Sequence, residues 1–224
     1  MATGDELIAV VKAGDADRVT MIVSGEPALA STRDGDGVSV LMLSRYRSNR
    51  AVTDALLAAD PDLDVHEAAA LGYLDRLRER LDEDPSRVGS LSADGYTALH
   101  FAAFFAKPEA ARILLEAGAP VDVVANNEMR VQPLHSAAAG RQTEICRLLL
   151  AAGADVDARE AGGFTPLHAA AQNGDPEMVE LFLSAGADPA ATTDDGTTSA
   201  DAAEAAGHGD VARRLREVAA ERPA

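Results

Sequence analysis

Three four-residue segments of the chain share one pattern and recur at a nearly constant spacing. They are Thr97-Ala98-Leu99-His100, Gln132-Pro133-Leu134-His135 and Thr165-Pro166-Leu167-His168, so that the histidines lie 35 and then 33 residues apart. A Gly-Ala pair begins 18 positions after each histidine, and an apolar triplet lies between the two. A period of this length is typical of repeat proteins, in which each unit is stable only when it stacks on its neighbours.

Each unit has the local signals of two short helices separated by a tight turn. Thr165 suits the N-cap of a first helix, and Pro166 suits its first turn, where no amide hydrogen is needed. Residues 174–176, Gly-Asp-Pro, end that helix and begin a second one, which Gly186 terminates. Helices of this length are unstable alone in water, so stability has to come from stacking.

With these landmarks the chain resembles the ankyrin repeats, whose Thr-Pro-Leu-His signature and 33-residue period match residues 92–191 most closely. It is also similar to small bacterial ankyrin proteins. The resemblance implies an all-α solenoid of about seven stacked helix-turn-helix repeats with short β-hairpin fingers. It further implies that a partner binds on a concave surface made by the fingers and the first helices.

The same phase extends beyond the best-matching region and predicts a single array over residues 1–224. The residues at the histidine position are Ile8, Met42, His66, His100, His135, His168 and Asp201. The predicted repeats span residues 5–33, 34–60, 61–91, 92–126, 127–159, 160–192 and 193–220, with the first and last acting as caps. Charged Arg213 and Arg214 stand where other repeats carry their buried triplet, which favours an array that ends at this repeat.

Two irregularities affect specific loops. The step from Met42 to His66 is only 24 residues, so residues 60–64 are too few for a finger. We therefore expect a discontinuity at residues 58–65, across which the first two repeats join the rest by helix stacking alone. Elsewhere Ala106, Arg130 and Arg141 replace turn glycines, and we expect distorted turns there.

Composition limits the partners and the location. The formal net charge is −17, with no basic stripe, which disfavours nucleic-acid binding. An acidic surface suits a basic protein partner, although a well-solvated surface alone accounts for it as well. The sequence has no signal-peptide pattern and no apolar run long enough to cross a bilayer, so we expect a cytoplasmic protein without a membrane partner.

No motif of the chain indicates catalysis. We expect no enzyme activity and no cofactor, because the chain lacks a phosphate-binding loop and a nucleophile elbow, and the repeats occupy its whole length. The repeated histidines are predicted to bond locally rather than to hold a metal, since stacked helices lie too far apart for shared ligation. The single cysteine, Cys146, is expected to be a buried apolar residue.

The family resemblance places a binding surface at the loop tips and on the exposed side of the first helices. The residues predicted to contact a partner are Tyr46, Arg47, Tyr96, Phe104, Phe105, Met129, Arg130, Val131, Phe164, Gln172 and Asn173. Aromatic, Met and Arg side chains are enriched at such interfaces. For Phe104 and Phe105 the alternative is packing between the first helices.

Two classes of function are compatible with these features. The first is a protein-interaction module, either an adaptor or an acidic inhibitor or immunity-type partner of a basic protein, and monomeric in isolation. The second is a structural protein that forms a homodimer through the same aromatic residues.

Overall fold

The computed structural model describes residues 2–221, and the regular secondary structure in that range is helical. Within it the fourteen α-helices are α1 (Gly4–Ala13), α2 (Ala16–Gly25), α3 (Val40–Tyr46), α4 (Arg50–Leu57), α5 (Val65–Leu71), α6 (Leu74–Glu83), α7 (Ala98–Phe104), α8 (Pro108–Glu116), α9 (Pro133–Ala139), α10 (Thr143–Ala151), α11 (Pro166–Gln172), α12 (Pro176–Ser184), α13 (Ser199–Ala205) and α14 (Gly209–Glu221). Three 3-10 helices are η1 (Pro27–Ser31), η2 (Pro85–Gly89) and η3 (Ala161–Gly163). Strand-like pairing in the described residues is limited to isolated bridges of Arg33 with Ser39, Leu91 with Thr97 and Thr192 with Thr198. The predicted all-α class is confirmed.

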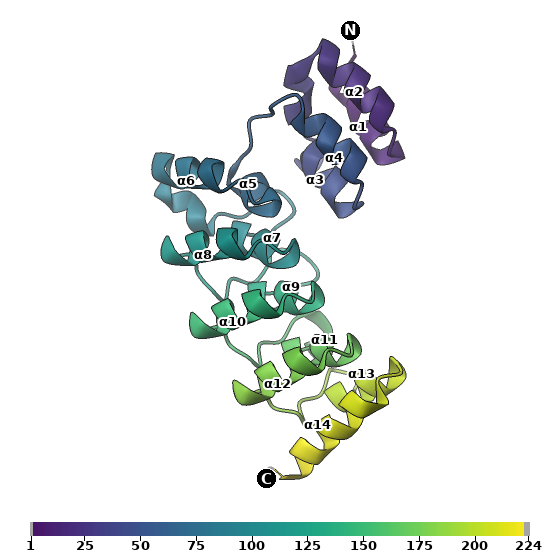
Figure 1. The fold of residues 1–224 in the computed structure, drawn as a ribbon, viewed down its shortest axis with the longest axis vertical. Coiled ribbons are helices and arrows are strands. Elements are labelled where there is room, and N and C mark those ends of the chain that lie inside the picture. The colour runs from purple at the N-terminus through teal and green to yellow at the C-terminus, as the bar shows by residue number, and fades with distance from the viewer. Residues whose placement is uncertain (1, 222–224) are drawn as a thin grey trace.

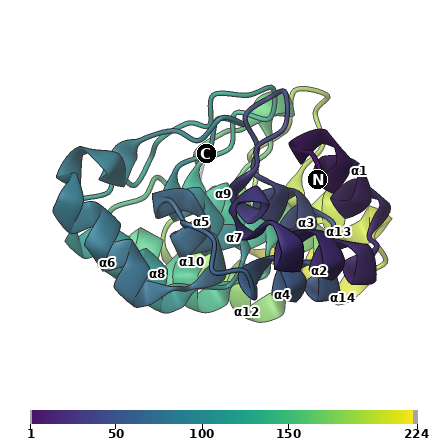
Figure 2. The ribbon, with the colours of Figure 1, turned by 90° about the horizontal axis from the view of Figure 1, so that it is seen from above.

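The helices contact one another in successive pairs, from α1 with α2 to α13 with α14. From α5 onward the first helices of these pairs stack on each other, and the second helices form a row beside them (Figure 1). Figure 2 shows the connecting loops gathered along one edge of the stack. The number and the boundaries of the repeats remain predictions.

Small side chains allow the first helices to approach closely. The buried alanines of these helices include Ala68, Ala69, Ala102, Ala103, Ala137, Ala138, Ala170 and Ala171. Larger side chains fill the layer between first and second helices, among them Leu77, Leu114, Leu149 and Phe182, all fully buried. Because the first helices from α5 to α11 are only seven residues long, this shared core is what stabilises them.

The turns without glycine keep the geometry of the glycine turns. Ala106 and Arg141 adopt left-handed φ angles of 57°, close to the 62° of Gly174 at the equivalent position. Arg130 likewise has a φ of 52°. The expected distortion is therefore wrong. The turns are preserved because stacking fixes both helices, and each non-glycine residue there costs about 1–2 kcal/mol of backbone strain.

Ala106→Gly should increase the free energy of unfolding by about 0.5–1 kcal/mol. Glycine relieves the left-handed backbone strain of the folded state. This gain outweighs the entropic stabilisation of the unfolded chain by glycine, which is worth roughly 0.4–1 kcal/mol. Urea unfolding measures the difference. Ala117→Gly is the matched control, since Ala117 is also exposed and ends a helix, but its φ is −77°. That variant should be less stable than the wild type, and a loss of stability in Ala106→Gly would contradict the prediction.

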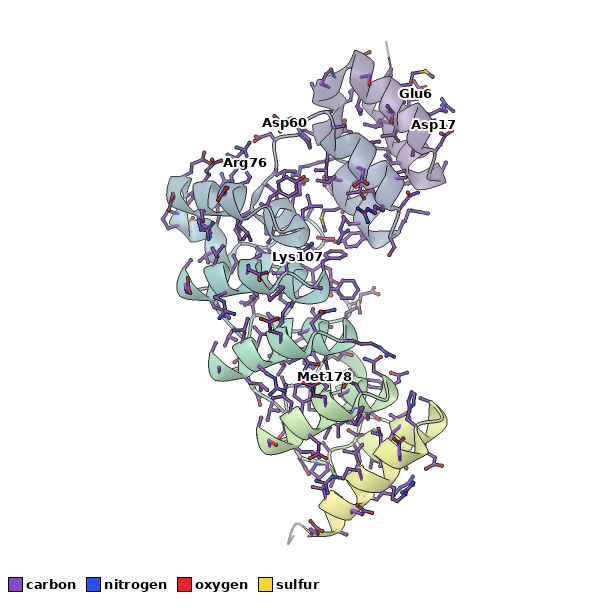
Figure 3. The ribbon with its side chains drawn as sticks, in the orientation of Figure 1. Glu6, Asp17, Asp60, Arg76, Lys107 and Met178 are labelled. Carbon is purple, nitrogen blue, oxygen red and sulfur yellow. The ribbon has the colours of Figure 1, made fainter. Side chains whose placement is uncertain are left out.

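The stack is interrupted between α4 and α5. Helices α1–α4, here called the N-terminal block, have a hydrophobic core of their own, and a second core runs from Val65 to Leu215. In Figure 1 the block is set off from α5 and α6, and Figure 3 labels Asp60 on the extended segment between them. None of the isolated bridges in residues 2–221 lies in residues 58–65, but the loops before α9 and α11 lack a bridge as well, so the missing finger stays a prediction.

The N-terminal block is not joined to the rest by helix stacking alone, so that part of the prediction is wrong. Helices α3 and α5 lack the close contact that joins α5 to α7. A small cluster of Met42, Ala70 and Phe101 connects the two cores instead. Polar contacts add to it, with Arg33 donating to Asp64 at 2.8 Å. With the loop too short to form a finger, side chains provide the connection.

Candidate protein-binding site

The repeated histidines join each first helix to the following loop. Their Nε2 atoms face backbone oxygens of that loop, in the pairs His66–Ser90 at 3.0 Å, His100–Val131 at 3.1 Å, His135–Ala158 at 3.0 Å and His168–Thr197 at 3.1 Å. At His100, His135 and His168, Nδ1 accepts a hydrogen bond from the amide three residues earlier, at 3.2 Å in each case. Nε2 therefore carries the hydrogen and donates. The predicted local bonding is confirmed at Nδ1 of these three rings, whereas each Nε2 bond reaches the loop that precedes the next first helix.

Next to these rings, the first helices and the fingers enclose a pocket of about 260 Å³. Its walls come from α3, α7 and α9 and from the loops that precede α7, α9 and α11. Six of the predicted contact residues line it: Tyr46, Tyr96, Phe104, Phe105, Met129 and Val131. Residues from three predicted repeats thus converge on one hollow. Stacking brings those of α7 and α9 side by side, and Tyr46 reaches them from the N-terminal block.

The rings of the pocket hold each other in place. Phe101 lies at the centre, with ring centroids 6.5 Å from Tyr46, 5.6 Å from Tyr96 and 6.4 Å from Phe105. The hydroxyl of Tyr46 donates to Asp94, and the hydroxyl of Tyr96 donates to Met129 Sδ at 3.4 Å. The hydroxyl groups of both tyrosines are thus satisfied within the chain, and the pocket presents mainly apolar surface.

The other predicted contact residues lie outside this pocket. Arg47, Arg130, Phe164 and Gln172 are exposed, whereas Asn173 is partly buried and donates from Nδ2 to the Ala138 carbonyl oxygen at 3.1 Å. Val131 does line the pocket, but only 6% of its surface is exposed. Val131 can therefore form part of the pocket wall, but it offers little surface for direct contact with a partner.

For Phe104 and Phe105 the alternatives were contact with a partner and packing between the first helices. The first fits Phe104 and the second fits Phe105. Phe104 is 49% exposed, as a recognition residue should be. Phe105 is only partly exposed, stacks on Tyr46 at 6.3 Å, and lies 4.5 Å below the guanidinium of Arg45. Phe105 therefore has mainly a packing role, and Phe104 rests edge-on against it at 5.2 Å.

Several pocket residues were missed by the sequence reasoning. They are His100, Phe101, His135, Ser136 and Glu160. Phe101 had a detectable signal, because it is the one aromatic residue that directly follows a histidine-position residue. For Glu160, in the loop before α11, the sequence carried no signal that distinguished it from the many other carboxylates.

Glu160 gives the pocket its charge. Its carboxylate is partly buried, and burial raises its pKa above the ordinary value of a glutamate. No ion pair or hydrogen bond of this carboxylate occurs among the described residues. Burial also raises the pKa of Tyr96, and the negative charges of Asp94 and Glu160 add to that effect. The pocket thus combines aromatic faces with an uncompensated negative potential.

Comparison with known proteins identifies the repeat. A family model described as an ankyrin repeat matches residues 94–126, and a second, described as ankyrin repeats in many copies, matches residues 134–183. The chain therefore contains ankyrin repeats. It is also similar to the human DNA-binding protein RFXANK, with 34% identity over 122 residues, which cover 53% of this chain and 45% of that protein. The matched region spans less than half the length of that relative.

Ankyrin repeats make this chain a protein–protein interaction module by architecture. Between residues 2 and 221, no helix is both long and apolar enough to cross a membrane. Over the same residues, no group of three or more His, Cys, Asp or Glu side chains is arranged to hold a metal ion. Cys146 is buried, and burial raises its thiol pKa to about 12, which disfavours the reactive thiolate.

Proposed function

We propose that this ankyrin-repeat protein binds a protein partner, without catalysis, at the aromatic pocket and the finger and first-helix surface around it. The observation that carries the proposal is the pocket itself, with Phe104 49% and Met129 57% exposed at its edge. Exposed apolar clusters of this kind mark interaction sites, and aromatic residues dominate binding energy at interfaces. The pocket is large enough for one side chain of a partner.

We infer that the inserted side chain is a lysine or arginine. Its aliphatic stem would lie against the rings, and its charge would be attracted by the aromatic faces and by Glu160. A cation at that carboxylate would offset the cost of its burial. The net charge of −17 would also accelerate association with a basic protein. An inhibitor or immunity-type partner of a basic protein fits this chemistry, and an adaptor role is compatible with it.

Nucleic acid is a poorer candidate. The name of the human relative assigns DNA binding to that protein, and the similar region covers 45% of it. Binding to DNA depends largely on contacts between cations and phosphates. This chain carries 37 acidic against 20 basic residues, so its surface repels a phosphate backbone.

The alternative is a homodimer formed through the same aromatic surface. Phe104 and Met129 of two copies would then cover each other, which would also explain apolar exposure. Light scattering after size exclusion decides between the two, because a monomer at tens of micromolar, as we expect, removes the dimer. A dimer that Phe104→Ala dissociates would replace the proposal of a separate partner.

Phe104→Ala should weaken partner binding by on the order of 2 kcal/mol and leave the melting temperature within a few degrees. The reason is that Phe104 is half exposed and supports little of the core. Immobilised wild-type and variant chains are compared for capture of proteins from the source cell. A protein held by the wild type and lost by the variant is then purified, and its Kd for each chain is measured.

Met21→Ala is the matched control, because Met21 is 74% exposed but lies on a second helix, α2, away from the pocket. It should bind the captured protein as the wild type does. Glu160→Gln in the same assay tests the charge of the partner, and should weaken binding and reduce its dependence on salt. Equal affinity of the wild type and Phe104→Ala would contradict the proposed site.

A further inference from the structure

A second cavity, of about 490 Å³, lies at the junction between the N-terminal block and the rest of the array. Arg45, at the end of α3, forms part of its wall on one side. Lys107, in the turn between α7 and α8 and labelled in Figure 3, forms part of the other. Phe105 contributes to both this cavity and the aromatic pocket. The two hollows therefore share one wall but differ in chemistry.

The charges in this cavity are mainly positive, in contrast to the chain as a whole. Its charged residues are Arg45, Arg50, Lys107 and Asp54. Asp54 pairs with Arg50 at 3.5 Å, which leaves two cations without a carboxylate. Among the described residues, neither Arg45 nor Lys107 forms an ion pair within 4 Å. With 37 acidic residues available, two uncompensated cations facing one cavity are unexpected.

Arg45 has an unmet hydrogen-bonding requirement. Its Nε atom is buried and has no hydrogen-bond partner, while its guanidinium lies over the Phe105 ring. A buried donor without an acceptor costs free energy, more so when the group is charged. Burial lowers the pKa of Arg45 and of Lys107, and the charge on Arg45 lowers the pKa of Lys107 further. The two cations thus destabilise each other.

Lys107 also stands at the N-cap of α8, a position at which three other second helices carry a capping acceptor, while Tyr73 of α6 and Gln142 of α10 do not cap. Asp15, Asn49 and Asp175 stand at the equivalent place, and each accepts a hydrogen bond from an amide of the helix it precedes. Lysine has no acceptor, so α8 begins without a side-chain cap. Its positive charge also lies at the positive end of the helix dipole, which is unfavourable. Glu109, in the first turn of α8, acts on Lys107 only through longer-range attraction.

We propose that this cavity binds an oxyanion, a phosphate or a carboxylate group, between the guanidinium of Arg45 and the ammonium of Lys107. Both groups suit such a ligand, since arginine presents a planar set of donors and lysine a compact charge. The anion would accept hydrogen bonds from guanidinium nitrogens other than the buried Nε, and it would neutralise the like charges. It would also connect α3 to the start of α8 across the interruption, where no finger joins the N-terminal block to the array.

The test uses sodium phosphate and sodium acetate as probes, each titrated into the full chain at constant ionic strength with sodium chloride. NMR follows the side-chain N–H signals of Arg45 and Lys107, and thermal unfolding follows stability. We expect saturable shifts of both signals with phosphate and a higher melting temperature. Shifts with phosphate alone would identify a phosphate site, and shifts with both probes would extend the site to carboxylates.

Lys107→Gln should bind phosphate at least roughly tenfold more weakly, because a charged hydrogen-bonding partner is lost. Lys12→Gln is the matched control, since Lys12 is the chain's other lysine and already pairs with Asp34 at 3.3 Å. It should bind phosphate as the wild type does. Lys107→Asp adds a variant expected to fold well, because it restores a cap and removes the repulsion, yet it should lose the anion.

No saturable shift in the wild type would overturn the proposal, as would equal phosphate affinity in Lys107→Gln and Lys12→Gln. These outcomes are independent of the proposed function, which rests on Phe104 and Glu160 in the other pocket. The anion site can fail while the partner-binding site stands, and the reverse is equally possible.

Discussion

Lowering the pH from 6.5 to 4 is expected to cost this protein about 3 kcal/mol of stability through His100 alone. The pKa of His100 is lowered from 6.5 to about 4, mainly by burial. Each unit of pKa difference corresponds to about 1.4 kcal/mol. Because the folded-state pKa is below the unfolded one, the unfolded chain binds more protons in this range. The stability is therefore fully present above pH 6.5 and is lost as the pH falls towards 4.

The geometry of the ring explains why protonation is unfavourable. Nδ1 of His100 accepts a hydrogen bond from the amide of Thr97, while Nε2 donates to the carbonyl oxygen of Val131. A second ring proton would sit on Nδ1 and point at the hydrogen of that amide. His135 and His168 have the same arrangement, and burial lowers their pKa values too, so they add to the loss. Glu67 and Glu160 oppose it slightly near pH 4.5, because burial raises their pKa values.

Urea unfolding at a series of pH values between 7 and 4 measures this loss. NMR titration of the imidazole signals in the folded protein identifies the groups responsible. His100→Gln should show a smaller dependence of stability on pH than the wild type over the same range. A folded-state titration of His100 near pH 6.5, or a stability that does not change between pH 6.5 and 4.5, would contradict the prediction.

The sequence predicted the helix pairs because each is specified by local signals. Thr97 and Thr165 each form a capping box with the histidine three residues later, and Gly174 has the left-handed φ that its turn needs. Such signals act over a few residues and repeat in phase. The helix boundaries that they indicate can therefore be predicted without knowing the rest of the fold. The turn at Ala106 lacks this local glycine signal, and it survives because stacking fixes the helices on both sides of it.

The candidate site was predicted less completely, because it depends on contacts between distant residues. The position after the loop glycine was expected to be exposed, and Phe164 is exposed there, but the shorter Val131 is covered. The hydroxyl of Tyr46 reaches Asp94, 48 positions along the chain, and no spacing rule predicts that contact. The contact depends on the position of the N-terminal block relative to the array, and the short segment at residues 58–64 connects the two.

Phe101→Ala should lower the free energy of unfolding by about 3–5 kcal/mol, as for other buried phenylalanines. The side chain is only 3% exposed and contacts both sides of the interruption. In a repeat array each unit is coupled only to its neighbours, so the loss should be local. Hydrogen exchange should show Gly4–Leu57 losing protection, while Pro133–Ser184 keeps most of its own.

Phe182→Ala provides the matched control, because Phe182 is fully buried in the main core, far from the junction. It should be comparably destabilising, but exchange should accelerate around α12 and leave the N-terminal block as it was. This pair of variants tests whether the aromatic cluster, rather than helix stacking, couples the N-terminal block to the array. An equal loss of protection along the whole chain in both variants would mean that the array unfolds as one unit. The interruption at residues 58–65 would then have no energetic consequence.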